Sequence, residues 1–149
     1  MSDALALSSS AETARRDALA DGLAVSAKAI VLDGGRVLLL RNYRNEWELP
    51  GGRPGDDESL AGAAVREVRE ETGLGTVAGE FVDFWDYEIA VEDAVVRVIS
   101  FVATLLDRST VVLSDEHDAF RWFGLDELTG IVLPDGYRRS IRLAAAAGD

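Results

Sequence analysis

One well-bounded helix among β-type segments constrains the fold of this chain more than any other feature. Residues 59–72 have helical character, with Ser59 suited to cap the first turn and Gly73 suited to end the last. The apolar positions that would face the core recur every four residues and are Leu60, Ala64 and Val68. Pro50-Gly51-Gly52 excludes a helix there, so the sequence predicts a loop before one internal helix.

Segments rich in apolar and β-branched residues lie on both sides of this helix. We expect strands at Leu23–Leu32, Val37–Leu40, Gly79–Ala90, Val95–Leu106 and Phe120–Phe123. The turn at Asp33-Gly34-Gly35 predicts that the first two strands form a hairpin. A short helix is expected at Leu125–Leu128, and a longer one at Tyr137–Ala147, after Pro134. Strands on both sides of a central helix predict a layered domain of the α/β (α+β) fold class.

A length of 149 residues predicts one domain, which we place at residues 22–149. Residues 1–21 are rich in alanine, serine and charge, and we interpret them as a separate N-terminal tail. Ser9 and Glu12 have the spacing of a capping box, which predicts a short helix, but this composition is also typical of partial disorder. The sequence leaves both alternatives open.

The charge and cysteine content exclude several classes of function. A formal net charge of −12 repels phosphate backbones, so we expect no nucleic acid duplex as a partner. The absence of cysteine excludes a thiolate metal site and a cysteine nucleophile, and it fits a cytoplasmic location. No apolar run approaches the ~20 residues that span a bilayer. We therefore expect a cytoplasmic protein without a membrane span or a signal peptide.

Three glutamates crowd the last two turns of the expected helix. Glu67, Glu70 and Glu71 fall within an arc of about 100° and share one face. Each like-charge pair costs a few tenths of a kcal/mol, roughly, and the negative end of the helix dipole adds to the cost. If the acidic face is solvated, Arg66 and Arg69 would offset the repulsion between the glutamates. If it is a metal site, a divalent cation would offset that repulsion. The charge pattern alone leaves both interpretations open.

The residues around these glutamates carry a more specific pattern. From Gly52 to Leu74 the sequence GRPGDDESLAGAAVREVREETGL resembles the Nudix box, G-x5-E-x7-R-E-U-x-E-E-x-G-U, where U is aliphatic. All of its constrained positions match, and they are Gly52, Glu58, Arg66, Glu67, Val68, Glu70, Glu71, Gly73 and Leu74. The chain is thereby identified as similar to the Nudix hydrolase (MutT-like) family.

The resemblance implies a fold and a reaction. The fold would be an α/β/α sandwich with a mixed central sheet and a catalytic helix. The reaction would be metal-dependent hydrolysis of the phosphoanhydride of a nucleoside diphosphate linked to another moiety. The expected cofactor is Mg²⁺ or Mn²⁺, and the expected partner is a small-molecule nucleotide: a nucleoside triphosphate, ADP-ribose or a nucleotide sugar. A homodimer is left open.

The resemblance also implies roles for the residues of the box. Glu67, Glu70 and Glu71 correspond to metal ligands, and the carbonyl of Gly51 joins them. Glu58 corresponds to a loop carboxylate that pairs with Arg66 and orders the loop against the helix. Gly52 and Gly73 correspond to structural glycines.

Members of the family place one more acidic residue in a distant loop, as a ligand or general base. Glu116 is the candidate here because its acidic loop precedes a short strand, and Asp115 and Glu92 are rivals. A solvated loop remains an alternative. Glu67, Glu70 and Glu116 are therefore the expected catalytic residues, with Glu67 or Glu116 favoured as the base.

Several residues outside the box have types that suit a nucleotide. Arg41 and Arg44 would bind phosphate, and Trp47 or Tyr87 would stack on a base, as would Phe84 or Trp85. Solvent-facing arginines and core aromatics are the alternatives. We interpret the single histidine, His117, as a surface loop residue. We expect Tyr137, Arg138 and Arg139 to open a surface helix rather than an anion site.

Two other functions fit a Nudix-like chain. A non-catalytic domain that senses a nucleotide ligand is the main alternative, but such domains lose box carboxylates, and this chain keeps them all. An isoprenyl diphosphate isomerase of the same fold depends on a cysteine, which this chain lacks. The complete box therefore favours an enzyme.

Overall fold

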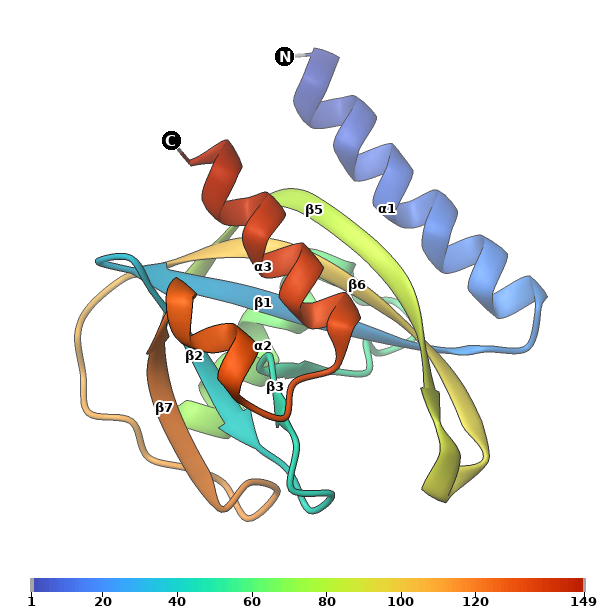
Figure 1. Cartoon of the computed structure of the whole chain (residues 1–149). Coiled ribbons are helices and arrows are strands. Elements are labelled where there is room, and N and C mark those ends of the chain that lie inside the picture. Colours follow the sequence, from blue (N-terminus) through green and yellow to red (C-terminus); the bar gives the residue numbers. More distant parts are fainter. Residues whose placement is uncertain (1, 149) are drawn as a thin grey trace.

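The computed structural model describes residues 2–148, and the side chains of residues 10–148 (Figure 1). In chain order its helices and strands are α1 (Ser2–Ala20), β1 (Ala24–Asp33), β2 (Arg36–Arg41), β3 (Trp47–Glu48), β4 (Gly51–Gly52), α2 (Leu60–Thr72), β5 (Thr76–Ile89), η1 (Ala90–Glu92), β6 (Ala94–Leu105), β7 (Ala119–Gly124), η2 (Leu125–Gly130) and α3 (Asp135–Ala147). None of the helices described is both long and apolar enough to span a bilayer.

Within this part of the chain the strands form a seven-stranded mixed sheet. The main order is β3-β2-β1-β6-β5, while β4 pairs with β1 and β7 pairs with β2. The neighbours β1 and β6 are parallel, and the other pairs are antiparallel. The mixed sheet and its helices confirm the predicted fold class. The two short strands β3 and β4, which the sequence did not predict, hold residues 47–52 against the sheet.

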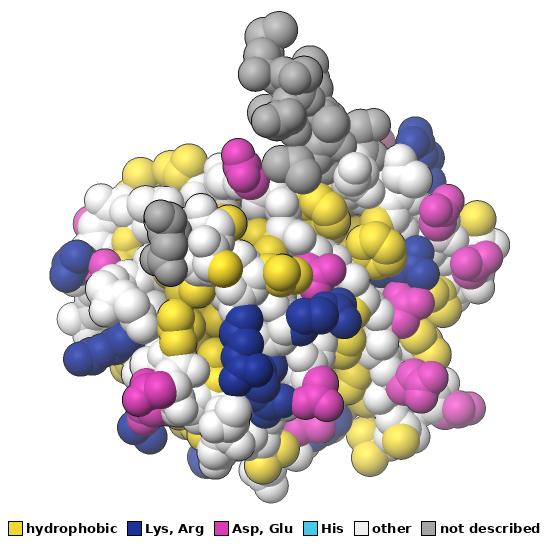
Figure 2. All heavy atoms as spheres, turned by 45° about the horizontal axis from the view of Figure 1, so that its top comes forward, with side chains coloured by type: hydrophobic (Ala, Val, Ile, Leu, Met, Phe, Trp, Pro, Cys, Tyr) yellow, Lys and Arg dark blue, Asp and Glu magenta, His cyan; other side chains and the backbone are white. Residues whose placement is uncertain are grey.

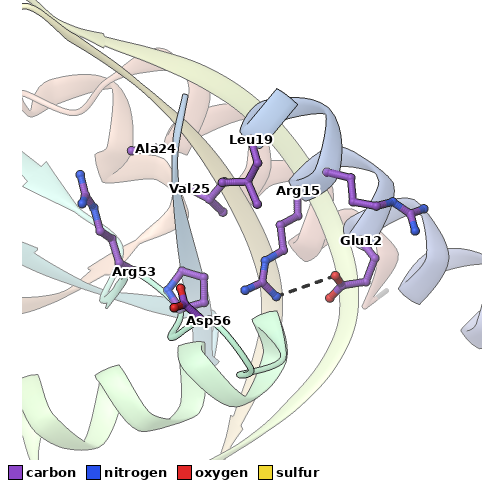
Figure 3. A pocket seen from close by; sticks show the side chains of 9 residues that line it. Glu12, Arg15, Leu19, Ala24, Val25, Arg53 and Asp56 are labelled. Atoms are coloured by element: carbon purple, nitrogen blue, oxygen red, sulfur yellow. Dashed lines mark ion pairs between the residues drawn. The ribbon is translucent and has the colours of Figure 1, made fainter. Parts of the chain in front are cut away.

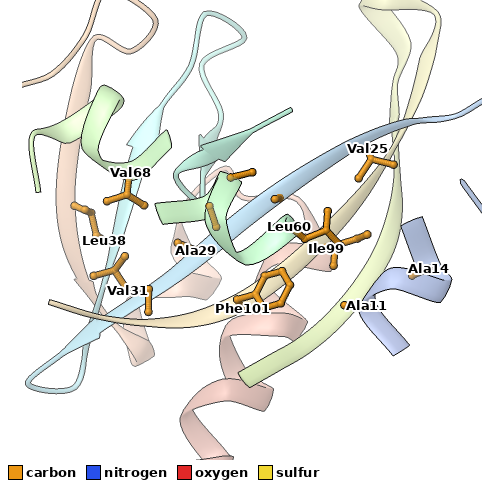
Figure 4. Packing of buried hydrophobic residues seen from close by; sticks show 14 of the residues in the cluster. Ala11, Ala14, Val25, Ala29, Val31, Leu38, Leu60, Val68, Ile99 and Phe101 are labelled. Carbon is orange, nitrogen blue, oxygen red and sulfur yellow. The ribbon is translucent and has the colours of Figure 1, made fainter. Parts of the chain in front are cut away.

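Alternating residues of the central strands build a core on each face of the sheet. On β2, Leu38 and Leu40 belong to the core that includes residues of α1 and α2, whereas Val37 and Leu39 belong to the core that includes residues of η2 and α3. Figure 4 shows the first of these cores, in which Leu60 and Val68 of α2 meet the sheet. Because the apolar face of α2 packs against the sheet, its polar face can carry the glutamates.

Helix α2 is bounded as the sequence predicts. The Ser59 side chain accepts a hydrogen bond from the Gly62 N–H at 3.0 Å. Gly73 has φ of 78°, in the left-handed region, and its N–H donates to the Arg69 carbonyl. These caps fix the ends of the helix and therefore the position of its acidic face.

Helix α1 is longer than a capping box at Ser9 would give, because Ser9 lies inside it rather than at its start. The side chains of Ala11, Ala14 and Ala18 are buried and pack on the same core as α2. Alanine gives little contrast between an apolar and a polar face, so helical periodicity was weak in this segment.

Candidate active site

The acidic face of α2 lies beside a cavity of about 500 Å³. The residues that line it are Asn42, Tyr43, Arg44, Glu48, Gly51, Gly52, Arg53, Glu67, Glu71, Glu116 and His117. A second cavity of about 220 Å³ shares the segment from Gly51 to Arg53 and extends to Lys28, Tyr87 and Tyr137. Together they form a groove, here called the box groove, that is lined by both carboxylates and tyrosines.

Glu71 and Glu67 bring poorly solvated charge to the box groove. Only 3% of Glu71 is exposed, and its Oε1 accepts the Gly51 N–H at 2.8 Å. Burial raises the pKa of Glu71 to about 7, although Lys28 and the Gly51 N–H favour its charged form. Burial also raises the pKa of Glu67, despite its bond from Arg66, and the charges of Glu70 and Glu116 act in the same direction.

The raised pKa values of these carboxylates are consistent with a site for a divalent cation. Carboxylates that are buried or adjacent to one another resist ionisation, and a hard cation among them removes that resistance. The oxygen donors of Glu67, Glu71 and Glu116 are of the type that Mg²⁺ and Mn²⁺ prefer. The residues present therefore suit the cofactor that the sequence predicts.

Arg66 ties the loop before α2 to the acidic face. Its guanidinium donates to both carboxylate oxygens of Glu58, from Nε at 2.7 Å and from Nη2 at 2.8 Å. Its Nη1 lies 3.1 Å from Glu67 Oε1 and 3.1 Å from both oxygens of Glu70. The hydrogen bonds from Arg66, with one from the Gly55 N–H, lower the pKa of Glu58 to about 2. Glu58 and Arg66 therefore form the pair that the box pattern implies.

Glu70 differs from the other two box glutamates in its surroundings. Its side chain is 56% exposed and pairs with Arg66, and it is not among the described residues that line the box groove. It still lies near enough to raise the pKa of Glu67. Its role as a ligand stays a prediction.

Two glycines allow the backbone to approach α2 and β1. A Cβ atom on Gly52 would lie 2.6 Å from Glu67 Cδ, so any side chain there would displace this carboxylate. Gly51 has φ of 147°, and a Cβ atom on it would lie 2.1 Å from the Ala27 carbonyl oxygen. Glycine is therefore required at both positions for the acidic face to meet β4.

The loop of residues 106–118 brings Glu116 to the box groove. The N–H groups of Val112 and Ser114 donate to the carbonyls of Thr72 and Glu71, which attaches this loop to the end of α2. Ligand atoms of Glu71, Glu116 and His117 all lie within 4.8 Å of one another. The fold thus places Glu116 beside the box face, and its chemical role stays a prediction.

His117 is not the surface residue that we expected. Only 8% of it is exposed, and its Nε2 lies 2.8 Å from Glu48 Oε2. The loop is attached to the end of α2, and this side chain lines the box groove. A lone histidine in a polar loop gives no sign of such burial, because its partner comes from residue 48, a distant part of the chain.

Sequence analysis also missed Lys28, which is buried, and Glu48, which is half-buried beside it. Lys28 Nζ lies 3.9 Å from Glu48 Oε2, and the Asn42 side-chain amide donates to Glu48 Oε1 at 2.9 Å. Burial would raise the pKa of Glu48, but Lys28, His117 and Asn42 lower it to about 2. The one available signal was Lys28 itself, a charge in the middle of an otherwise apolar strand.

The candidate substrate residues divide into two groups. Arg44 and Tyr87 line the box groove, with Arg44 Cζ 5.7 Å from the centre of the Tyr87 ring. Arg41 instead pairs with Asp118 at 2.9 Å, and Trp47 packs edge-on against Phe123 in the core. Neither Arg41 nor Trp47 is among the described residues that line the groove.

Among the other candidates, Glu92 lines the smaller cavity, whereas Phe84, Trp85, Arg138 and Arg139 are not among the described residues that line the groove. Trp85 packs edge-on against Tyr137, and Arg97 lies over the Phe84 ring. Glu92 pairs with Arg44 at the smaller cavity. Arg138 donates to the Leu128 carbonyl, and Arg139 pairs with Asp83. The described contacts of Arg138 and Arg139 therefore fit a structural role.

Comparisons with known proteins find relatives in one family. The NUDIX domain model matches residues 22–145. The CTP pyrophosphohydrolase of Escherichia coli (strain K12) is 32% identical over 105 residues, which are 66% of this chain and 74% of that protein. The asymmetrical bis(5'-nucleosyl)-tetraphosphatase of Mus musculus is 31% identical over 86 residues, 56% of this chain and 58% of that protein.

A solved structure gives the same result. The MutT protein from Methanosarcina mazei Go1 superposes with a TM-score of 0.72 and 31% identity, and the match covers 85% of this chain and 96% of that one. The chain therefore belongs to the Nudix family. Helix α1 precedes the region that the family model matches.

Proposed function

We propose that this Nudix enzyme hydrolyses the phosphoanhydride of a nucleoside diphosphate linked to another moiety, with Mg²⁺ or Mn²⁺ as cofactor. One observation carries the proposal: Glu67 and Glu71 of a complete box line one cavity with Glu116 from a distant loop. No local requirement of helix α2 explains why a third carboxylate should be brought to a face that is already acidic.

The side chains have separate tasks in this mechanism. Glu67, Glu71 and Glu116 would hold the ion, with Glu70 beside them. When bound, a divalent ion neutralises phosphate charge and activates water for attack on phosphorus. Glu67 or Glu116 accepts the proton of the attacking water, and Arg66 holds Glu67 in place through its contact at 3.1 Å.

The rest of the box groove suits the remainder of a nucleotide. Arg44 and Arg53 line both of its cavities and would bind phosphate oxygens. Tyr43 and Tyr87 offer ring faces for a base or sugar. We propose nucleoside triphosphates, ADP-ribose and nucleotide sugars as substrates, and the names of the relatives put CTP and dinucleoside tetraphosphates on the same panel.

A substrate panel tests this function. Purified protein is incubated with each compound and either Mg²⁺ or Mn²⁺, and released phosphate, pyrophosphate and nucleotide are measured. We expect hydrolysis of at least one compound and a loss of roughly 100-fold or more in the isosteric variant Glu67→Gln. Tight binding without turnover of any compound would instead indicate the nucleotide-sensing alternative.

A further inference from the structure

The imidazole of His117 lies between two carboxylates of the box groove. Its Nε2 is 2.8 Å from Glu48 Oε2, and its Nδ1 is 3.8 Å from Glu71 Oε2, too far for a hydrogen bond. Nδ1 is buried and has no hydrogen-bond partner among the described residues. A buried nitrogen without a partner is costly, so this atom calls for a ligand that the protein itself does not supply.

The contact with Glu48 determines which nitrogen is available. An ionised carboxylate only accepts hydrogen bonds, so Nε2 carries the proton in this pair. Glu48 is kept ionised by Lys28, by the Asn42 amide, and by Arg44 Nη2 at 3.7 Å. In the neutral imidazole, Nδ1 then holds a lone pair directed toward the box carboxylates. A carboxylate that accepts one ring N–H is the usual partner of a histidine whose other nitrogen binds metal.

The surrounding donors complete a small cluster. One oxygen of Glu71, one oxygen of Glu116 and one ring nitrogen of His117 lie within 4.8 Å of one another. Ligands of one ion, at distances of about 2.0–2.2 Å from it, are separated by at most about 4.4 Å. A small contraction of the loop of residues 106–118 would therefore bring the three atoms to a shared ion.

We propose that Nδ1 of His117 is a nitrogen ligand to a divalent ion held with Glu71 and Glu116, and that Glu48 orients the imidazole for this task. The inference rests on the proposed function and adds to it a selectivity for the metal. Mg²⁺ prefers an all-oxygen shell, whereas Mn²⁺ and later transition metals accept imidazole. The site should consequently bind Mn²⁺ with an advantage over Mg²⁺ that depends on His117.

The experiment uses the fact that the chain has a single histidine. The protein is labelled with ¹⁵N-histidine, loaded with one equivalent of Mn²⁺, and studied by pulsed electron paramagnetic resonance. We expect a nitrogen coupling that changes from a ¹⁴N to a ¹⁵N pattern with the label. Bound Mn²⁺ without a label-dependent coupling would overturn the proposal, as would failure of Mn²⁺ to bind.

Variants measure the energetic contribution of this nitrogen. His117→Gln keeps an amide donor for Glu48 and removes the ring lone pair, while Asp115→Asn alters the same loop outside the cluster. By equilibrium dialysis, we expect His117→Gln to weaken Mn²⁺ binding on the order of tenfold, to weaken Mg²⁺ binding much less, and Asp115→Asn to change neither. Equal losses for both ions in His117→Gln would contradict nitrogen ligation and indicate a structural role.

The substrate panel with Mg²⁺ separates this inference from the proposed function. If hydrolysis requires Glu67 but the ¹⁵N label leaves the Mn²⁺ spectrum unchanged, the enzyme assignment stands and the histidine ligand is wrong. If a label-dependent coupling is present but no compound is hydrolysed, the ligand is correct and the hydrolase proposal fails.

Discussion

Arg66 binds both carboxylate oxygens of Glu58, eight residues away, through Nε at 2.7 Å and Nη2 at 2.8 Å. The same guanidinium also contacts Glu67 and Glu70 through Nη1. One side chain therefore fixes the loop before α2 and orients two box glutamates. Lysine has the charge but not the planar fork, so it would not replace both functions.

We expect Arg66→Lys to lower kcat by about 10- to 100-fold while the protein stays folded, because Glu67 would lose its orientation. Steady-state kinetics on the substrate from the panel, with circular dichroism as the control for folding, would measure this. The double variant Arg66→Lys with Glu58→Gln should be hardly worse than Arg66→Lys alone, since the two residues act as one unit. Additive losses in the double variant would show that they act independently.

Glu71 predicts a coupling between pH, metal and stability. Burial raises its pKa in the folded protein to about 7, from an ordinary value of 4.5. Below pH 4.5 the Glu71 side chain is protonated in both the folded and the unfolded protein, so the free energy of unfolding is at its highest. As the pH rises from 4.5 through 7, the unfolded protein releases this proton first, and the free energy of unfolding falls.

In a metal-free buffer, we therefore expect the melting temperature to fall between pH 5 and pH 8 more steeply in the parent than in Glu71→Gln. Millimolar Mg²⁺ should restore stability at pH 8 in the parent, since an ion that binds only the folded state stabilises it. Thermal melts with EDTA or Mg²⁺ at each pH give the comparison. The same slope in both proteins would show that Glu71 does not cause it.

Local signals account for the parts of the molecule that the sequence predicts well. The apolar stripe, the Ser59 cap and the pairing of Glu58 with Arg66 all depend on residues within one short segment. The network of Lys28, Glu48 and His117 joins three segments, and Glu48 and His117 are 69 positions apart in the sequence. No periodicity or spacing in one sequence reports such a contact, because only the sheet register brings these strands and this loop together.

The substrate candidates illustrate the same limit. Arg41 and Arg44 are close in sequence and have the same chemistry, yet Arg44 lines the groove and Arg41 pairs with Asp118. Strand β2 ends at Arg41, and the turn that follows carries Arg44 back over the site. A difference of three residues in a turn determines which arginine lines the groove, and residue type does not encode it.

Glu116 should act on turnover rather than on substrate affinity. Its side chain lines the groove with Glu67, whose pKa is raised mainly by burial, and the charge of Glu116 acts in the same direction. As a base or metal ligand it would contribute mainly in the transition state. We expect Glu116→Gln to lower kcat by roughly 100-fold with a much smaller change in KM.

Asp115→Asn, an adjacent change in the same loop, is the control and should leave both constants close to those of the parent. A rise in KM at constant kcat in Glu116→Gln would assign Glu116 to uniform substrate binding instead. A parental rate in that variant would remove Glu116 from the mechanism.

Helix α1 supports the loop that carries Glu58. Arg15 extends from α1 and donates from Nη1 to the Glu58 carbonyl at 2.8 Å and from Nη2 to the Gly55 carbonyl at 3.2 Å. A cavity of about 440 Å³ lies beside Arg15, and Arg53 of the box groove also lines it. Figure 3 shows these side chains between α1 and this loop. On the face shown in Figure 2, Lys and Arg side chains are interspersed with Asp and Glu side chains.

We expect Arg15→Ala to lower the stability of this loop more than that of the domain. Charge-assisted hydrogen bonds contribute about 1.5–3 kcal/mol each at most, and here both acceptors lie in residues 55–58. Hydrogen exchange of residues 53–58 should accelerate, and kcat should fall a few-fold as Glu58 and Arg66 lose their fixed positions. Arg16→Ala is the matched control, because Arg16 bonds to Thr13 within α1 and should change stability by no more than about 0.5 kcal/mol. Equal exchange rates in Arg15→Ala and Arg16→Ala would mean that α1 does not order the loop.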